Sequence, residues 1–122
     1  MKASLKDLWN ARATLGKLAG MSFKAKTAYK LMKLIDQVNK EIEPFSKVRQ
    51  ELFLKYGDQD GDRVTIKPEN IEIFSKELEE LESQEIELKF TVNLDEIGEV
   101  ELSPSELYDL DFMLKEDMAI SQ

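Results

Sequence analysis

The feature that most restricts the fold is one long helical period in the first half of the chain. Apolar side chains recur there at alternating steps of three and four residues, which places them on one face of an α-helix. The period spans four heptads, and only Arg49 stands where an apolar residue is due. Leu34, Val48 and Phe53 widen the apolar face, which favours a globular core or bundle over a two-stranded coiled coil. The residues of the period are Ala28, Leu31, Ile35, Val38, Ile42, Phe45, Leu52 and Tyr56.

Pro44 lies in the middle of this helix. It removes one backbone hydrogen bond and clashes with the carbonyl of Lys40, so we expect a kink between Asn39 and Pro44. The apolar period keeps its phase on both sides of the proline, which indicates a kinked helix rather than two separate ones. Gly57 follows the last apolar residue and is a good stop signal.

Local signals predict three further helices. A first helix over residues 4–20 begins with a capping box of Ser4 and Asp7. A third helix begins at Pro68, and we expect its single apolar stripe to pack on the long helix. A short fourth helix follows the capping box of Ser103 and Glu106.

After residue 84 the apolar period changes from helical to two, with Ile86, Leu88, Phe90 and Val92 alternating with polar residues, which indicates a half-buried strand. A turn-rich stretch separates it from residues 100–102, where alternation resumes. We therefore expect an antiparallel hairpin, to which residues 64–67 add a third strand in one arrangement.

Together these elements predict a single α+β domain over residues 1–122. It is mostly helical, with a long kinked central helix packed by two further helices, a small antiparallel β-hairpin and a short C-terminal helix. The predicted core is Leu8, Trp9, Leu15, Leu31, Ile35, Val38, Ile42, Phe45, Leu52, Phe74, Leu78, Ile86, Leu88 and Phe90.

The C-terminal helix carries more apolar surface than two turns easily bury. Leu107, Leu110 and Leu114 give it one apolar face, and Tyr108, Phe112 and Met113 add to it. Either these side chains pack in the core, which we favour, or some of them contact a partner. We expect residues 115–122 to form a frayed tail.

An acidic loop is the one stretch with the spacing of a metal site. Asp58, Asp60 and Asp62 occupy positions one, three and five of a calcium-binding loop, and Glu69 occupies position twelve. The glycine that such a loop needs at position six is replaced by Arg63. We therefore favour a solvated acidic turn that opens a short strand over residues 64–67.

The chain contains neither histidine nor cysteine. This removes a histidine general base, thiol nucleophiles, and the imidazole and thiolate ligands of zinc. The five glycines form no phosphate-binding loop. We assign no catalytic residue and no cofactor, and we expect a protein that is not an enzyme.

Charge is divided between the two parts of the chain. Residues 1–35 carry eight lysines or arginines and one aspartate, whereas residues 36–122 carry nine basic and 24 acidic residues. Such a division concerns docking and partners rather than topology. The candidate partner-binding residues are the basic Lys17, Lys24, Lys26, Lys30 and Lys33 and the acidic Glu77, Glu79, Glu80 and Glu82.

Several runs of the sequence resemble small uncharacterised proteins of tailed bacteriophages and prophages of Gram-positive bacteria. The resemblance covers nearly the whole chain and implies a phage accessory role in the cytoplasm of a bacterial host, without a catalytic or binding site to transfer. The runs are Lys26-Thr27-Ala28-Tyr29-Lys30-Leu31, residues 33–57, residues 70–81, and Leu102-Ser103-Pro104-Ser105-Glu106-Leu107.

Three functions compete at this stage. The leading one is a non-enzymatic interaction protein for assembly or host takeover, in which the basic segment meets the acidic half within one chain or across a homo-oligomer interface. The second is an inhibitor that presents the acidic residues 77–117 to a basic groove on a host defence or nucleic-acid-binding protein. The third is nucleic-acid binding by the basic segment, which the net charge of −8 disfavours. No apolar run approaches the roughly 20 residues of a membrane span.

Overall fold

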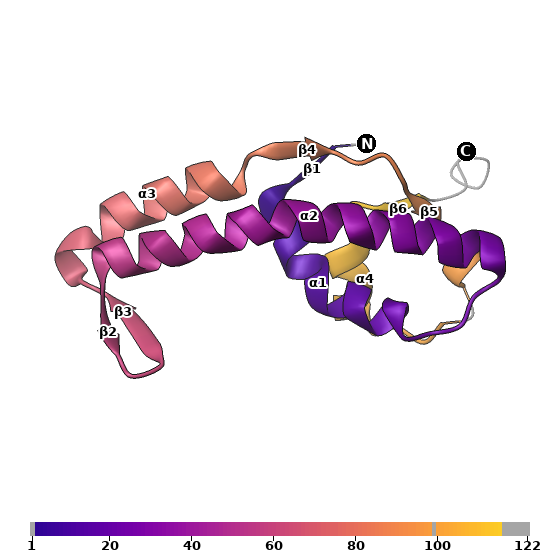
Figure 1. Cartoon of the computed structure of the whole chain (residues 1–122), viewed down its shortest axis with the longest axis horizontal. Helices are drawn as coiled ribbons and strands as arrows, with labels where there is room; N and C mark the ends of the chain where they lie inside the picture. Colours follow the sequence, from indigo (N-terminus) through magenta and orange to yellow (C-terminus); the bar gives the residue numbers. More distant parts are fainter. Residues whose placement is uncertain (1, 99, 116–122) are drawn as a thin grey trace.

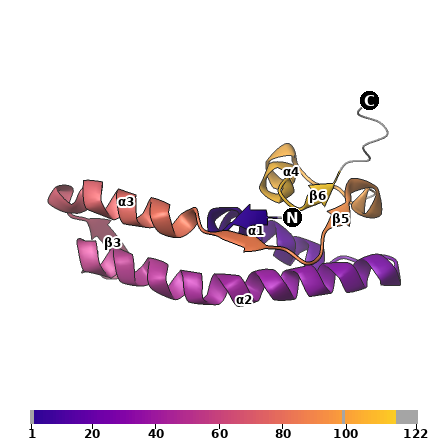
Figure 2. The same cartoon turned by 90° about the horizontal axis from the view of Figure 1, so that it is seen from above.

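The computed structural model describes residues 2–98 and 100–115. Its longest element, α2, runs along most of the length of the molecule, and the other elements pack on one side of it (Figures 1 and 2). The helices are α1 (Leu5–Ala19), α2 (Ala25–Tyr56), α3 (Ile71–Glu82) and α4 (Pro104–Leu110), with 3₁₀ turns η1 (Pro68–Asn70) and η2 (Leu94–Ile97). The strands are β1 (Lys2–Ser4), β2 (Gly57–Asp60), β3 (Arg63–Ile66), β4 (Glu85–Glu87), β5 (Val92–Asn93) and β6 (Leu114–Lys115).

The helix boundaries follow the local signals. At the start of α1, the Asp7 backbone N–H donates to Ser4 Oγ and the Ser4 N–H donates to Asp7 Oδ2, each at 3.1 Å, so the predicted capping box is confirmed. The α4 box is also confirmed, because Ser103 and Glu106 exchange the same pair of bonds. The helix α2 passes through Pro44 unbroken and ends at Tyr56, directly before Gly57, and Figure 2 shows it as a shallow bow.

The strand pairing differs from the predicted hairpin. Residues 100–102 form no strand; instead β4 pairs antiparallel with β1, with Ala3 opposite Ile86, and β5 pairs parallel with β6. A small antiparallel sheet is therefore present, but the N-terminal residues supply its second strand. The prediction was wrong because pairing depends on which segments the helices bring together, whereas alternation identifies only one strand at a time.

Residues 64–67 do not join that sheet either. β3 pairs with β2 in a separate hairpin that projects from the end of α2 (Figure 1). Gly61 has a φ of +64° and is the first of the two loop residues, the place where a type II′ turn takes glycine.

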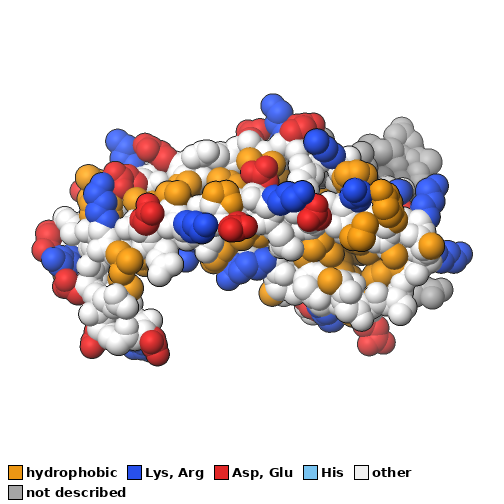
Figure 3. All heavy atoms as spheres, viewed as in Figure 1, with side chains coloured by type: hydrophobic (Ala, Val, Ile, Leu, Met, Phe, Trp, Pro, Cys, Tyr) orange, Lys and Arg blue, Asp and Glu red, His pale blue; other side chains and the backbone are white. Residues whose placement is uncertain are grey.

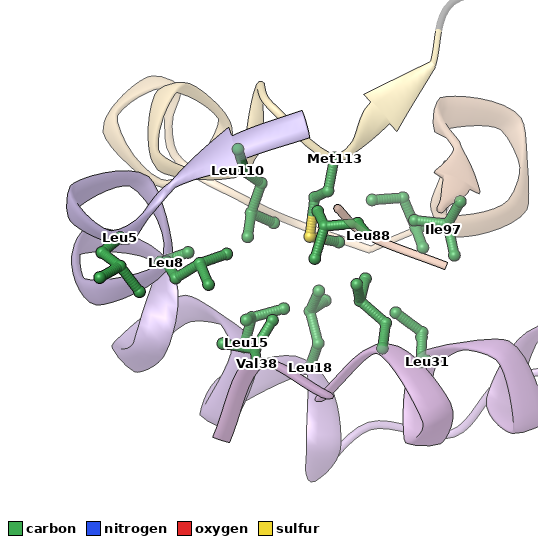
Figure 4. Packing of buried hydrophobic residues seen from close by; sticks show 14 of the residues in the cluster. Leu5, Leu8, Leu15, Leu18, Leu31, Val38, Leu88, Ile97, Leu110 and Met113 are labelled. Carbon is green, nitrogen blue, oxygen red and sulfur yellow. The ribbon is translucent and has the colours of Figure 1, made fainter. Parts of the chain in front are cut away.

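The main core joins side chains that are far apart in the sequence. Leucines of α1, Leu31 and Val38 of α2, and Leu110 and Met113 from the C-terminal region point toward one another (Figure 4). Seven of the predicted core residues are buried: Leu8, Leu15, Leu31, Val38, Phe45, Phe74 and Leu88. The others are only partly buried: Trp9, Ile35, Ile42, Leu52, Leu78, Ile86 and Phe90. Buried residues outside the predicted core list include Leu5, Ala11, Leu18, Leu34, Val92, Ile97, Leu110 and Met113.

The third helix and the C-terminal residues were also predicted to pack in the core. As predicted, α3 packs on α2, and Phe74 meets Phe53 with ring centroids 4.9 Å apart. Of the apolar residues after Pro104, Leu110 and Met113 are fully buried, whereas Tyr108 is 83% exposed. The predicted frayed tail lies mostly outside the described residues.

Candidate protein-interaction surface

The structure brings part of the basic segment against the acidic half within one chain. Lys17 Nζ lies 3.1 Å from Glu106 Oε1, and Lys30 Nζ lies 3.1 Å from Glu96 Oε2. The two glutamates also accept the backbone N–H of Ser103 and Asn93, respectively, at helix starts. Two of the five candidate lysines therefore hold the C-terminal region on α1 and α2.

These contacts favour the charged form of both carboxylates. The backbone N–H of Asn93 and then the ammonium group of Lys30 lower the pKa of Glu96. In the same way the Ser103 N–H and then Lys17 lower the pKa of Glu106. Each glutamate thus combines a capping contact with a contact to the basic segment.

The other three candidate lysines have no carboxylate partner among the described residues. Lys24 is the residue before α2 and lies beside a hollow that Glu96 also lines. Lys26 is exposed, and Lys33 Nζ lies 5.6 Å from the centre of the Tyr29 ring. The basic segment is therefore dispersed over several faces rather than gathered into one.

The candidate glutamates all lie on α3. Glu79 and Glu82 line a cleft of about 440 Å³ together with Lys2 and Lys6. Glu77 is half-buried and Glu80 is exposed. This cleft is a second place where the basic N-terminus faces the acidic half, although no ion pair joins the two sides within the described residues.

The four carboxylates of the candidate calcium loop are not gathered into a site. Asp58 and Asp60 lie on β2, Asp62 lies in the turn, and Glu69 lies in η1. Asp58 Oδ1 is instead 3.5 Å from Lys67 Nζ. Within residues 2–98 and 100–115 no three acidic side chains are placed to hold a metal ion. The hairpin turn at Gly61 accounts for this, because it extends the segment that a calcium loop would wrap around the ion.

A groove between α1 and α2 is lined mainly by apolar side chains, and we call it the α1–α2 groove. Its volume is about 350 Å³. Met32 on α2 is 55% exposed at this groove, and the neighbouring Tyr29 is 56% exposed. Figure 3 shows apolar side chains gathered between the two helices there. The groove is lined by Leu18, Ala19, Met21, Phe23, Ala28, Leu31, Met32, Ile35, Asp36 and Asn39.

Farther along the contact of α1 with α2, where Trp9 meets Phe45, two arginines stack on Trp9. The Arg12 guanidinium carbon lies 3.6 Å from the Trp9 ring centre, and that of Arg49 lies 4.9 Å from it and 4.7 Å from the Phe53 ring centre. Arg49 Nε is buried and has no hydrogen-bond partner. Arg49, which interrupts the apolar period of α2, thus replaces an aliphatic contact with stacking on two rings.

The sequence did not identify this surface as a site. The available signals were two residues that break local rules, the arginine in the apolar period and Gly16 in the interior of α1. Neither identifies a groove until the crossing of α1 and α2 is known.

No protein-family model, curated protein or solved structure matches the chain. Among the described residues, no helix combines the length and the apolar character that crossing a membrane requires.

Proposed function

We propose that the protein is a non-enzymatic interaction protein that binds another protein through the α1–α2 groove. The observation that carries the proposal is the apolar groove itself, with Met32 more than half exposed at it. A solvent-facing concave apolar surface of this kind is typical of a binding site. In keeping with the resemblance to phage proteins, we propose an assembly or host-takeover role in the cytoplasm of a bacterial host, with a phage or host protein as partner.

The distribution of charge supports binding by apolar contact. Lys17 and Lys30 are engaged by glutamates of the same chain, and along α2 the charges alternate in sign. Figure 3 shows blue and red side chains in turn along this helix. Such a surface adds little long-range attraction, so the affinity must come chiefly from the apolar groove.

Affinity capture of the tagged protein from infected and uninfected bacterial lysates tests the proposal. Met32→Lys places a charge at the groove, whereas Leu54→Lys places one at another exposed position of α2 and is the matched control. The recovery of each captured protein is quantified by mass spectrometry. We expect at least one partner that is captured by the Leu54→Lys variant but not by the Met32→Lys variant. Equal recovery of every partner by the two variants would exclude the groove.

An acidic inhibitor remains a second candidate, because Glu79, Glu80 and Glu82 of α3 form no ion pair within the described residues. Such carboxylates are free to meet a basic groove on a nucleic-acid-binding protein. Replacing all three by glutamine removes the charge and keeps the shape. Capture of a nuclease or polymerase that this triple variant loses would favour the inhibitor.

Nucleic-acid binding has less support. The pairs of Lys17 with Glu106 and of Lys30 with Glu96 leave fewer free ammonium groups for phosphates. Binding of labelled duplex or single-stranded DNA in low salt tests this function. A shift of the labelled DNA at micromolar protein would support nucleic-acid binding.

A homo-oligomer is tested by sedimentation in about 0.15 M and 0.5 M salt, since the higher concentration strongly screens exposed charges. Dissociation in the higher salt would show that contacts between the basic and acidic parts also join two chains.

A further inference from the structure

We propose that the α1–α2 groove binds a single amphipathic helix of a partner protein, whose carboxylate side chains face Arg12 and Arg49 and whose backbone passes close over Gly16. This inference rests on the proposed function, and it names the shape and the charge of the bound segment. Three independent features of the surface support it.

The first feature is a glycine that the described fold does not require. Gly16 lies in the interior of α1, is exposed, and has no positive φ. A Cβ atom built on it has nothing within 4 Å, so no internal packing demands its absence. Glycine is a poor residue for a helix interior, and it is favoured where another backbone must come close.

The position of Gly16 connects it to the groove. Trp9, Arg12, Gly16 and Ala19 follow one another at steps of three and four, so they share one face of α1. Ala19 lines the groove at one end of this face. At the other end Trp9 contacts Phe45 of α2, with ring centroids 5.5 Å apart. Gly16 therefore lies between the apolar end of the face and its arginine end.

The second feature is the charge at the Trp9 end. Arg12 and Arg49 both stack on Trp9, and within the described residues neither forms an ion pair. Arg49 also has a buried Nε without an acceptor. Two guanidinium groups without a carboxylate select an acidic segment, because they bind carboxylates through well-directed hydrogen bonds.

The third feature is the shape of the groove, which favours a helix as its occupant. Ala28, Met32, Ile35 and Asn39 recur on α2 at steps of three and four. Leu18 and Ala19 at the end of α1, with Met21 and Phe23 after it, line the opposite side. Two helices that flank a groove form the usual seat for a third helix, which presents apolar residues at the same steps. From the groove, α1 continues back past Gly16 and Arg12 to Trp9, and the whole helix is about 22 Å long, or roughly four turns.

A second copy of this chain is a poorer occupant. Exposed positions of α2 carry the ion pairs Asp36–Lys40 and Glu43–Lys47. On α3 the exposed isoleucines at positions 71 and 73 are two residues apart and so do not share a helical face, and α4 has only seven residues. No described helix offers three exposed large apolar side chains at helical steps, so the helix comes from a different protein.

Selection from an mRNA-displayed library of random 16-residue peptides against the full-length protein tests the inference. Binders are then measured by fluorescence anisotropy, and Trp9, the only tryptophan, reports on the arginine end. We expect helical peptides with apolar residues at i, i+3, i+4 and i+7 and with Asp or Glu at one end. Gly16→Leu should weaken the binding of these peptides at least tenfold. The thermal midpoint of the variant protein should stay at or above that of the wild type. Asn10→Leu, an exposed change on another face of α1, is the control and should bind normally.

A charge exchange tests the orientation. Arg12→Glu should weaken the acidic peptides, and peptides in which lysine replaces the acidic residues should recover binding to this variant. If the binders are lost with Met32→Lys but resist Gly16→Leu, or lack an acidic end, this inference is wrong and the proposed function stands. If no binder responds to Met32→Lys, the proposed function fails as well. Self-association that Gly16→Leu abolishes would identify a second copy as the occupant and would overturn the inference.

Discussion

The same substitution at two glycines should have opposite effects on stability. Gly16→Ala adds a Cβ atom in the interior of α1, where nothing lies within 4 Å. Alanine is about 1 kcal/mol more favourable than glycine in a helix interior, because it restricts the unfolded chain and costs no strain here. We expect the free energy of unfolding to rise by about that amount. For a chain of this size the thermal midpoint should rise by roughly 4 °C.

Gly57→Ala should destabilise the protein. Its Cβ atom would lie 2.7 Å from the Phe53 carbonyl oxygen, 2.7 Å from Val64 Cγ1 and 2.8 Å from the Thr65 carbonyl oxygen. Two of these three atoms belong to the backbone, so they cannot move aside by a change of rotamer. The backbone of Gly57, with φ −123° and ψ 173°, suits any residue, so the cost is steric and should be about 1–3 kcal/mol.

Urea denaturation followed by far-ultraviolet circular dichroism measures both changes, and Trp9 fluorescence reports separately on the α1–α2 contact. The dependence on urea should stay the same in each variant, so that a change of midpoint reports a change of stability. A loss of stability in Gly16→Ala would show that α1 needs this glycine for its own packing. Wild-type stability of Gly57→Ala would refute the close approach of β3 to the end of α2.

Three further predictions follow from the core, the ion pairs and the long helix. Leu8 is fully buried, so Leu8→Ala should cost about 2–5 kcal/mol in urea denaturation, and a cost below 1 kcal/mol would contradict the described core. Because the folded pKa of Glu96 is lowered from 4.5, its stabilising effect is present above that pH and is lost as the pH falls through the folded pKa. Glu96→Gln should therefore be less stable than the wild type at pH 7, and this difference should shrink as the pH is lowered below 4.5. A difference that does not change as the pH falls would refute this contribution. Pro44 removes a hydrogen bond inside α2, so Pro44→Ala should raise the free energy of unfolding by at least 1 kcal/mol, measured in the same way, and a loss would show that the proline is needed for the bow of the helix.

Local signals predicted the helices well because each signal acts over a few residues. The capping boxes at Ser4 and Ser103 form as the sequence indicates, and the continuous period of α2 prevails over Pro44. The strand at residue 86 was also identified, since alternation is a local pattern. Its partner was not, because β1 lies more than 80 residues away and reaches β4 only through the packing of α1.

The candidate site was likewise predictable only in part from the sequence. The division of charge predicted that the basic segment meets the acidic half, and the pairs Lys17–Glu106 and Lys30–Glu96 place two such contacts within one chain. Counting charges does not say which lysines are used. For residues 58–69 the misplaced glycine already favoured an acidic turn over a calcium loop, and the positive φ of Gly61 turns the chain back into a hairpin there.

The sequence alone thus determined where helices begin and end, which residues lie on the apolar face of α2, and which chemistries are absent, because composition, capping and periodicity depend on neighbouring residues. The tertiary structure decided which strands pair, which half of the predicted core is buried, and that a groove remains between α1 and α2. These properties depend on the angle at which distant segments cross. The roles of Arg49 and Gly16 also depend on the tertiary structure. In the sequence each residue is only an exception to a local rule, and its place near the contact of α1 with α2 appears only once the two helices are packed.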